Sequence, residues 1–358
     1  MTPPVGGIDP HQDTFTVGIV DHHGVEIAHE TFENTAAGYG CAIDLLGGHG
    51  VERVGVEGSA KWGAHVAVAL VAAGYDAREV PASRSAAQRR SRRLDKTDAV
   101  ASARALLAEP TLGPVQALEA YDPLVAEIEA VLEHRRTLVA ARTLMLHHVG
   151  DQIAKLPAEI RDQLTSHGKI ESRLRRLEQV DPAECSIPAG RYRLEWLQAF
   201  IDHDRTARSD IRRLERLIDE LLDRHGTTLR DETGIGPIAA ATLLCEVGDP
   251  HRFGRESKFA RWCGTGAVAL SSGEGSGDPV KHRLDFRGNR RVNSVLHIAS
   301  VTQARQQPDA AAYLARKASE GKTRREARRA HKQHLANRVI RRMRRDEQAR
   351  KSHLAAAA

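Results

Sequence analysis

The chain has 358 residues, a formal net charge of +6 and a pI near 9.3. This length suffices for about two or three domains, and because only 4% of residues are aromatic, their cores must be mainly aliphatic. The positive charge is clustered: five arginines lie between Arg84 and Arg93, and a basic stretch runs from Arg324 to Lys351. Such clusters favour a polyanionic partner over a small acidic substrate, although solvated helix faces also carry them.

The four cysteines are widely separated in sequence and form no C-x-x-C pair. This pattern argues against a zinc ribbon or a disulfide framework and is typical of a reducing cytoplasm. The chain also shows no signal peptide and no apolar run near the length of about 18 residues that a membrane span needs. We therefore expect a cytoplasmic protein without a membrane partner.

The first 32 residues predict a meander of three strands, the third running from Val25 to Phe32. Phe15, Val17 and Ile19 alternate with small or polar residues, which is the period of a half-buried strand. Asp9 stands at the end of the strand before it, and Gly6 and Gly7 would allow another element to approach the backbone beside this acid. Alone, Asp9 is better explained as the residue that opens a turn before a proline.

The elements that follow extend the sheet. The stretch Asn34-Thr35-Ala36-Ala37 is expected to cap a short helix that runs to about residue 46. A strand at 51–56 that ends in Glu57, a helix to about 73 and a strand at 75–80 are expected to follow. Asp95 and Asp98 then open a helix that continues to about 108. This order predicts a ribonuclease-H-like sheet, in which the acids of two strand ends and one helix meet at one edge.

Four carboxylates in this arrangement predict a metal site: Asp9, Glu57, Asp95 and Asp98. Carboxylates about 4 to 6 Å apart repel one another unless a cation lies between them, and hard oxygen ligands select Mg²⁺ or Mn²⁺. The simpler interpretation of the helix acids is capping, because acids suit a helix N-terminus.

Long helices are predicted in the middle of the chain, at about 124–156 and 205–225. Their apolar residues recur every three or four positions, as in a coiled coil, with Arg135 and Arg142 interrupting the first seam. We expect these helices to pack on each other or on a partner subunit. The domain boundaries expected from these patterns are 1–118, 119–226 and 227–345, followed by a basic, flexible tail at 346–358.

The third region contains a tight turn, Thr233-Gly234-Ile235-Gly236-Pro237, that leads into an apolar helix and is similar to half of a helix-hairpin-helix. Backbone N–H groups at such a turn can face a phosphate, although an ordinary turn before a core helix explains it equally well. Further on, Ser271-Ser272-Gly273 precedes a basic loop that leads into another apolar helix.

Three N-terminal motifs and the C-terminal series together resemble the DEDD-type transposases of the IS110 insertion-sequence family. The N-terminal motifs are Gly7-Ile8-Asp9-Pro10-His11, Val56-Glu57-Gly58 and Asp95-Lys96-Thr97-Asp98-Ala99. The C-terminal series runs from the Gly234 turn through Ser272-Gly273 to Arg287-Gly288-Asn289. The family's lysine-containing motif can also be aligned so that its last acid falls on Ala101, but we assign Asp95 and Asp98 because Asp98-Ala99 then keeps the family's D-A pair.

The resemblance implies a RuvC-like N-terminal domain, a helical coiled-coil segment and a mainly helical C-terminal transposase domain. It implies that Asp9, Glu57, Asp95 and Asp98 bind Mg²⁺ or Mn²⁺ and that Ser272 is the nucleophile, forming a covalent DNA–serine intermediate. It also implies a guide (bridge) RNA, dimers that pair into tetramers on DNA, and a prokaryotic, nucleoid-associated protein. We assign nucleic-acid contacts to Arg89, Arg90, Arg92, Arg93, Gly234, Gly236, Lys281, Arg283, Arg287, Arg290 and Arg291.

Two other functions remain open from the residues. A RuvC-like metal nuclease would use water as its nucleophile and would not need Ser272. A non-catalytic nucleic-acid-binding protein would account for the basic clusters without any metal-dependent cleavage.

Overall fold

A computed structural model of the chain describes residues 2–59, 62–80, 98–109, 112–115, 117, 121–164, 170–266, 268–269, 282–283 and 288–357. The chain divides into two compact units. The first comprises Met1–Ala126, Gly226–Ile235 and Thr242–Ala358, and the second comprises Glu127–His225 and Gly236–Ala241. Among the described residues, no helix combines the length and the apolar character that crossing a membrane requires.

A five-stranded mixed sheet forms the N-terminal part of the first unit, in the order β3-β2-β1-β4-β5. Its strands are β1 (Val5–Pro10), β2 (Thr14–Val20), β3 (Glu26–Glu33), β4 (Arg53–Glu57) and β5 (Asp76–Val80). The first three strands are antiparallel, whereas β4 pairs in parallel with β1 and β5 in parallel with β4. This topology confirms the predicted ribonuclease-H-like sheet, with its initial three-stranded meander.

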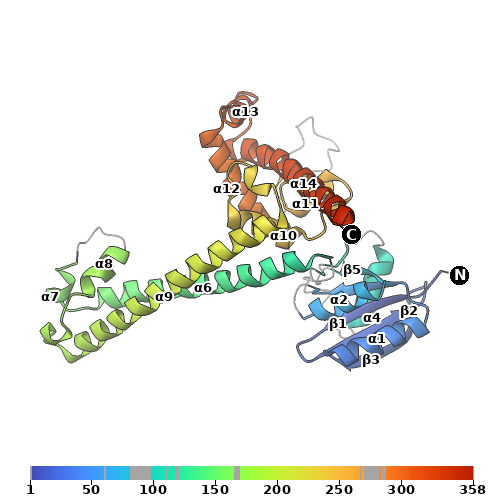
Figure 1. The fold of residues 1–358 in the computed structure, drawn as a ribbon, viewed down its shortest axis with the longest axis horizontal. Helices are drawn as coiled ribbons and strands as arrows, with labels where there is room; N and C mark the ends of the chain where they lie inside the picture. Colours follow the sequence, from blue (N-terminus) through green and yellow to red (C-terminus); the bar gives the residue numbers. More distant parts are fainter. Residues whose placement is uncertain are drawn as a thin grey trace, which may run out of the picture. The chain divides into compact units, whose positions relative to one another are not determined.

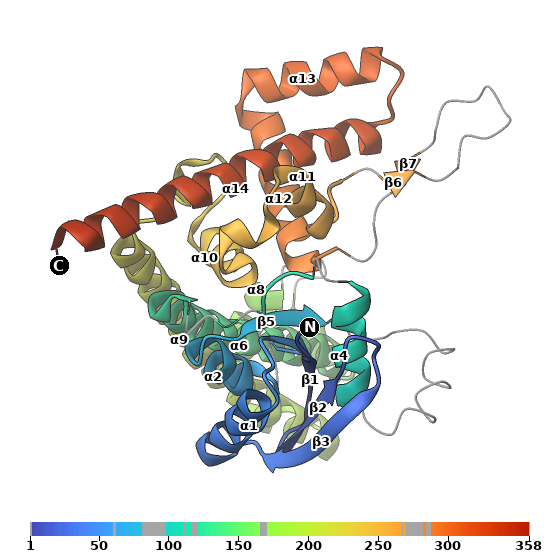
Figure 2. The ribbon, with the colours of Figure 1, turned by 90° about the vertical axis from the view of Figure 1, so that its right-hand side faces the viewer.

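Helices cover both faces of this sheet (Figure 2). On one face, Leu46 of α1 (Ala36–Gly48) and Leu70 of α2 (Ala64–Ala72) pack with the inward strand residues, which include Ile8 and Phe15. On the other face lies α4 (Asp98–Ala108). The expected cap of α1 is present, because the Thr35 side chain accepts a hydrogen bond from the Gly38 N–H.

The second unit contains α9 (Pro188–His225) and, from Glu127 on, α6 (Pro123–Ala154). These two long antiparallel helices lie side by side in Figure 1. Between them are α7 (Ala158–Arg161), α8 (Ile170–Leu177) and η1 (Pro182–Glu184). Arg135 pairs with Glu215 at 2.6 Å and Arg142 with Asp204 at 2.7 Å. The two arginines that interrupt the predicted seam therefore bind carboxylates of the facing helix, and the predicted helices pack on each other.

The C-terminal part of the first unit is mainly helical, as predicted. Its elements are η2 (Leu229–Asp231), α10 (Pro237–Val247), η3 (Pro250–Phe253), α11 (Glu256–Trp262), β6 (Val268–Ala269), β7 (His282–Arg283), α12 (Arg290–Gln306), α13 (Pro308–Ser319) and α14 (Arg324–Ala357). Helices α11, α12 and α13 all contact α14, so the three shorter helices pack against one long helix.

Helix α14 continues through the boundary expected at residue 346. Asp346 is buried and accepts hydrogen bonds from the Thr227 hydroxyl and from the backbone N–H and hydroxyl of Thr228, at 2.7 to 3.1 Å. The neighbouring Glu347 pairs with His251 at 3.0 Å. The expected flexible tail is therefore a packed helix at its start, because two acids within the basic stretch bind groups from distant parts of the chain.

Candidate active site

A row of three glycines crosses the sheet beneath α4. Gly7 of β1 pairs with Gly18 of β2 on one side and with Gly55 of β4 on the other. A Cβ atom at Gly7 would lie 2.1 Å from the Ala99 carbonyl oxygen, and one at Gly18 would lie 2.7 Å from the Val100 nitrogen. At Gly55 it would lie 2.9 Å from the Ser102 oxygen. The helix backbone therefore rests directly on the strand backbones, and no residue with a side chain fits at these positions.

The same geometry brings three of the expected acids to one edge of one face. Alternate strand residues share a face, so Asp9 and Glu57 lie on the side of Gly7 and Gly55, two residues nearer the strand ends. The ladder of β1 and β4 pairs Ile8 with Val56, which places Asp9 and Glu57 at neighbouring strand ends. Asp98 is the first residue of α4, directly before the Ala99 that covers Gly7.

The donor chemistry of these acids fits a hard divalent cation. Asp9, Glu57 and Asp98 supply carboxylate oxygens, and all three residues are partly buried. Asp9 also lies 3.4 Å from the His11 Nε2. Among the described residues, no three His, Cys, Asp or Glu side chains are grouped closely enough to hold a metal ion, and Asp95, the remaining expected ligand, lies outside those residues.

The turn that follows Glu57 is held by Glu79, a residue that the sequence did not point to. Glu79 lies on β5, and its carboxylate accepts a hydrogen bond from the hydroxyl of the buried Ser59. Burial raises the pKa of Glu79, while the hydrogen bond from Ser59 and the charge of Arg252 act in the opposite direction. Only the pairing of β4 with β5 brings Glu79 to this turn, so no local sequence signal identifies it.

Several predicted site residues lie outside the described residues: Ser272, Arg89, Arg90, Arg92, Arg93, Lys281 and Arg287. The backbone of Arg283 lies in the short β6–β7 ladder, opposite Val268. The helices on either side of residues 267–287 are held together. The Asn289 N–H donates to the Trp262 oxygen at 2.7 Å, and a Cβ atom at Gly288 would lie 2.4 Å from the Gly264 nitrogen.

The remaining predicted contact residues differ in their surroundings. Gly234 lies against α12, where a Cβ atom would be 2.8 Å from the Ala299 Cα, so packing already accounts for this glycine. At Gly236, a Cβ atom would meet no heavy atom within 4 Å. Arg291 pairs with Glu246 at 2.9 Å but remains largely exposed, and Arg290 is exposed.

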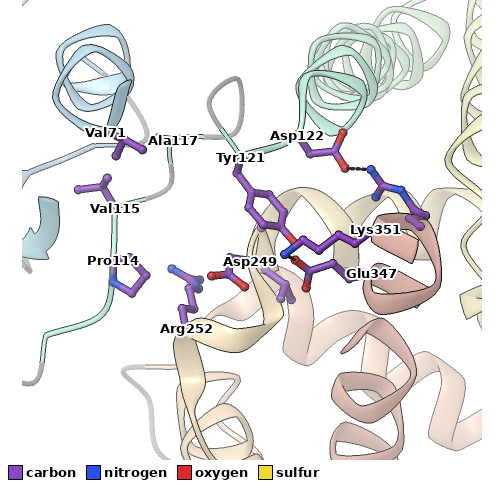
Figure 3. Close-up of a pocket in the computed structure, with 13 residues that line it drawn as sticks. Val71, Pro114, Val115, Ala117, Tyr121, Asp122, Asp249, Arg252, Glu347 and Lys351 are labelled. Atoms are coloured by element: carbon purple, nitrogen blue, oxygen red, sulfur yellow. Dashed lines mark hydrogen bonds and ion pairs between the residues drawn. The ribbon is translucent and has the colours of Figure 1, made fainter. Parts of the chain in front are cut away.

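A cavity of about 380 Å³ lies in the first unit (Figure 3), and its lining includes none of the predicted site residues that the structure describes. Asp122 caps α6 by accepting from the Leu124 N–H, and it also pairs with Arg350 of α14 at 2.5 Å. Glu347 pairs with Lys351 at 2.6 Å. The pKa of Tyr121 is raised, chiefly because its hydroxyl is buried. Charged groups of the cavity wall thus bind one another, and of the predicted acids that the structure describes, Asp9, Glu57 and Asp98, none lines the cavity.

Two protein-family models match the sequence. A family model described as "Transposase IS116/IS110/IS902 family" matches residues 226–315, and the model of the IS110 DEDD transposases matches residues 6–154. One similar solved structure is T. thermophilus RuvC in complex with a Holliday junction substrate, with 18% identity and a TM-score of 0.21. That likeness covers 28% of this chain and 74% of the RuvC chain. No curated protein matches the sequence.

The residue ranges that the two family models match include the candidate residues described above. The DEDD model covers Asp9 and Glu57 on the sheet and Asp98 on the helix that lies across it, and DEDD nucleases of this kind generally use divalent metal ions. The IS116/IS110/IS902 model covers the turn at Gly234 and the helices on either side of residues 267–287. The chain therefore belongs to the IS110 family of DEDD transposases, enzymes that cleave and transfer DNA strands.

Proposed function

We propose that this transposase cuts and rejoins the DNA of an insertion sequence through a covalent intermediate on Ser272. The observation that carries the proposal is the glycine row, because it fixes Asp98 at the sheet edge where Asp9 and Glu57 end their strands. Asp95 comes three residues before Asp98 and would complete the set. When bound by these four acids, Mg²⁺ or Mn²⁺ would supply positive charge beside the scissile phosphate.

In the proposed reaction, the Ser272 oxygen forms a bond to phosphorus while the bond to the departing DNA oxygen breaks. The covalent intermediate retains the phosphodiester energy, so a second DNA end can replace the serine without an external energy source. The family membership and the Ser272-Gly273 pair support this assignment. The clustered arginines support DNA as the substrate and an element-encoded guide RNA as a second partner.

We further infer that the transposase works as at least a dimer, and as a tetramer on DNA. The middle of α6 supports this inference, since Leu144 is 59% exposed and Leu138 and Met145 are only partly covered. A second copy of the helix pair would remove these apolar groups from water.

The deciding experiment traps the reaction with labelled DNA and maps the DNA-linked peptide by mass spectrometry. We expect the adduct on Ser272, its loss in Ser272→Ala, and its retention in the matched control Ser271→Ala. Asp98→Asn should abolish Mg²⁺-dependent cleavage without unfolding the protein. Cleavage that persists in Ser272→Ala would instead identify a nuclease with water as the nucleophile, and a folded wild-type chain without metal-dependent cleavage would identify a non-catalytic binding protein.

A further inference from the structure

An open pocket of about 520 Å³ lies where α13 and α14 pack together in the C-terminal part of the first unit. Four lining residues belong to α14 and follow one another at intervals of three or four, so they share one face of the helix: His331, His334, Arg338 and Arg341. Tyr313 of α13 also lines this pocket, which we call the α13–α14 pocket. Its lining includes none of the described residues predicted above to take part in catalysis or nucleic-acid binding.

Three rings meet in the α13–α14 pocket. The centroid of the Tyr313 ring lies 5.4 Å from that of His334, with the two planes at 83°, and 5.8 Å from that of His331. Two cations lie beside the same tyrosine, since Arg316 Cζ is 5.4 Å and Lys317 Nζ is 5.7 Å from its centroid. Both distances are within the range of a cation–π attraction. The pocket therefore combines aromatic surface with positive charge at the same tyrosine.

Hydrogen bonds hold the polar side chains of the lining in place. Glu232 Oε1 accepts from the fully buried Gln303 side chain and from Arg338 Nη2, both at 2.9 Å. Gln307 Nε2 donates to the Thr233 hydroxyl at 2.9 Å. Because these groups are already positioned, a ligand that binds to them has little side-chain ordering to drive.

The charges of the lining residues nearly cancel. The acids Glu232 and Asp309 oppose Arg338 and Arg341, and Arg338 is paired with Glu232 at 2.9 Å. Burial, the main cause, lowers the pKa of His331 and so favours its neutral imidazole. A phosphate would find little net positive charge inside this lining. A neutral, planar group with a π-face and polar edges matches it better.

We propose that the α13–α14 pocket binds an unpaired nucleobase of a nucleic-acid strand. A nucleobase is flat and uncharged and carries donors and acceptors along its edge, and unpaired bases stack on Tyr and His side chains. The base would stack against the Tyr313–His334 pair, while Glu232 and Gln307 bind its edge. The cations beside the tyrosine would meet the phosphates that flank the base. This inference rests on the proposed function, because it assumes a DNA substrate or a guide RNA.

The test measures binding of the full chain by fluorescence anisotropy across KCl concentrations. The labelled probes share one sequence and are a single-stranded DNA, the corresponding single-stranded RNA and the DNA duplex. The variants are Tyr313→Ala and His334→Ala, and Tyr313→Phe keeps the ring. The matched controls lie outside the pocket: Tyr192→Ala, at a residue that is 72% exposed on α9, and His353→Ala, at an exposed residue of α14.

Loss of one stacked base should weaken single-strand binding roughly tenfold in both alanine variants. Duplex binding should be unchanged, because a paired base cannot enter the pocket. The log–log salt slope should also keep its wild-type value, since no phosphate contact is lost. Tyr313→Phe and the two controls should bind like the wild type. The single-stranded polymer that shows the loss identifies the source of the base.

Wild-type single-strand affinity in both alanine variants would overturn the pocket, as would a wild-type chain that binds only the duplex. An equal loss on the duplex with a shallower salt slope would also overturn it, because that result identifies a phosphate contact. If thermal unfolding shows that Tyr313→Ala is not folded, the exposed His334→Ala decides the outcome. If the pocket fails while the wild type still forms its Ser272 adduct, the proposed function stands. A wild-type chain that binds none of the probes overturns both.

Discussion

Replacing Gly7 with alanine tests whether contact between α4 and the sheet assembles the acid site. The added Cβ atom would lie 2.1 Å from the Ala99 oxygen and 2.4 Å from the Ala103 nitrogen. Both are backbone atoms and cannot rotate away. Helix α4 must therefore retreat by roughly 1 Å to reach an ordinary van der Waals separation, and Asp98 at its first residue must move with it.

This displacement should reduce both stability and activity. Forced expansion of a packed core costs about 1 to 3 kcal/mol, and the backbone clash places Gly7→Ala near the upper end, at about 3 kcal/mol. A shift of about 1 Å in a catalytic group can lower the rate roughly 100-fold. We expect a lower urea-unfolding midpoint for the full chain and a comparable loss of Mg²⁺-dependent cleavage.

Two other glycines provide matched controls. Gly40 lies inside α1 with no heavy atom within 4 Å of a new Cβ, so Gly40→Ala should stabilise the protein by about 0.5 to 1 kcal/mol and leave cleavage unchanged. Gly6 faces the opposite side of the sheet, where the new atom meets the flexible Leu46 side chain at 2.8 Å, so Gly6→Ala should have an intermediate effect. If Gly7→Ala matches the wild type in both assays, the proposed assembly of the site is wrong.

Three further predictions concern the rest of the chain. Asp204→Ala, which removes the closer of the two carboxylates that Arg142 and Arg208 share and leaves only the more distant Glu171, should lower the unfolding free energy by about 2 kcal/mol. An unchanged melting temperature would contradict this. Burial and, to a lesser extent, the charge of Arg338 lower the pKa of His331 in the folded chain. As the pH falls, the His331 imidazole is therefore protonated in the unfolded chain before it is protonated in the folded chain, so the free energy of unfolding should fall below about pH 6.5. This fall should be smaller in His331→Gln. Light scattering should find at least a dimer, and a monomer both with and without nucleic acid would refute the proposed assembly.

Much of the N-terminal fold follows from local sequence patterns. The alternation of Phe15, Val17 and Ile19 predicted β2, because strand residues alternate between faces whatever their distant partners are. A helix cap within Asn34-Thr35-Ala36-Ala37 was predicted for a similar reason, since a capping side chain such as Thr35 binds an N–H only three residues away. The placement of Asp9 and Glu57 at strand ends also depends only on where each strand stops.

Tertiary structure decided what each of these residues meets. Gly6 and Gly7 look equivalent in the sequence, yet one faces a side chain of α1 and the other the backbone of α4, because consecutive strand residues point to opposite faces. Arg142 was read only as an interruption of an apolar seam, because its partner Asp204 lies 62 residues away. The start of the predicted tail proved to be packed helix for the same physical reason: Asp346 is bound by Thr227 and Thr228, and only the folded chain brings them together.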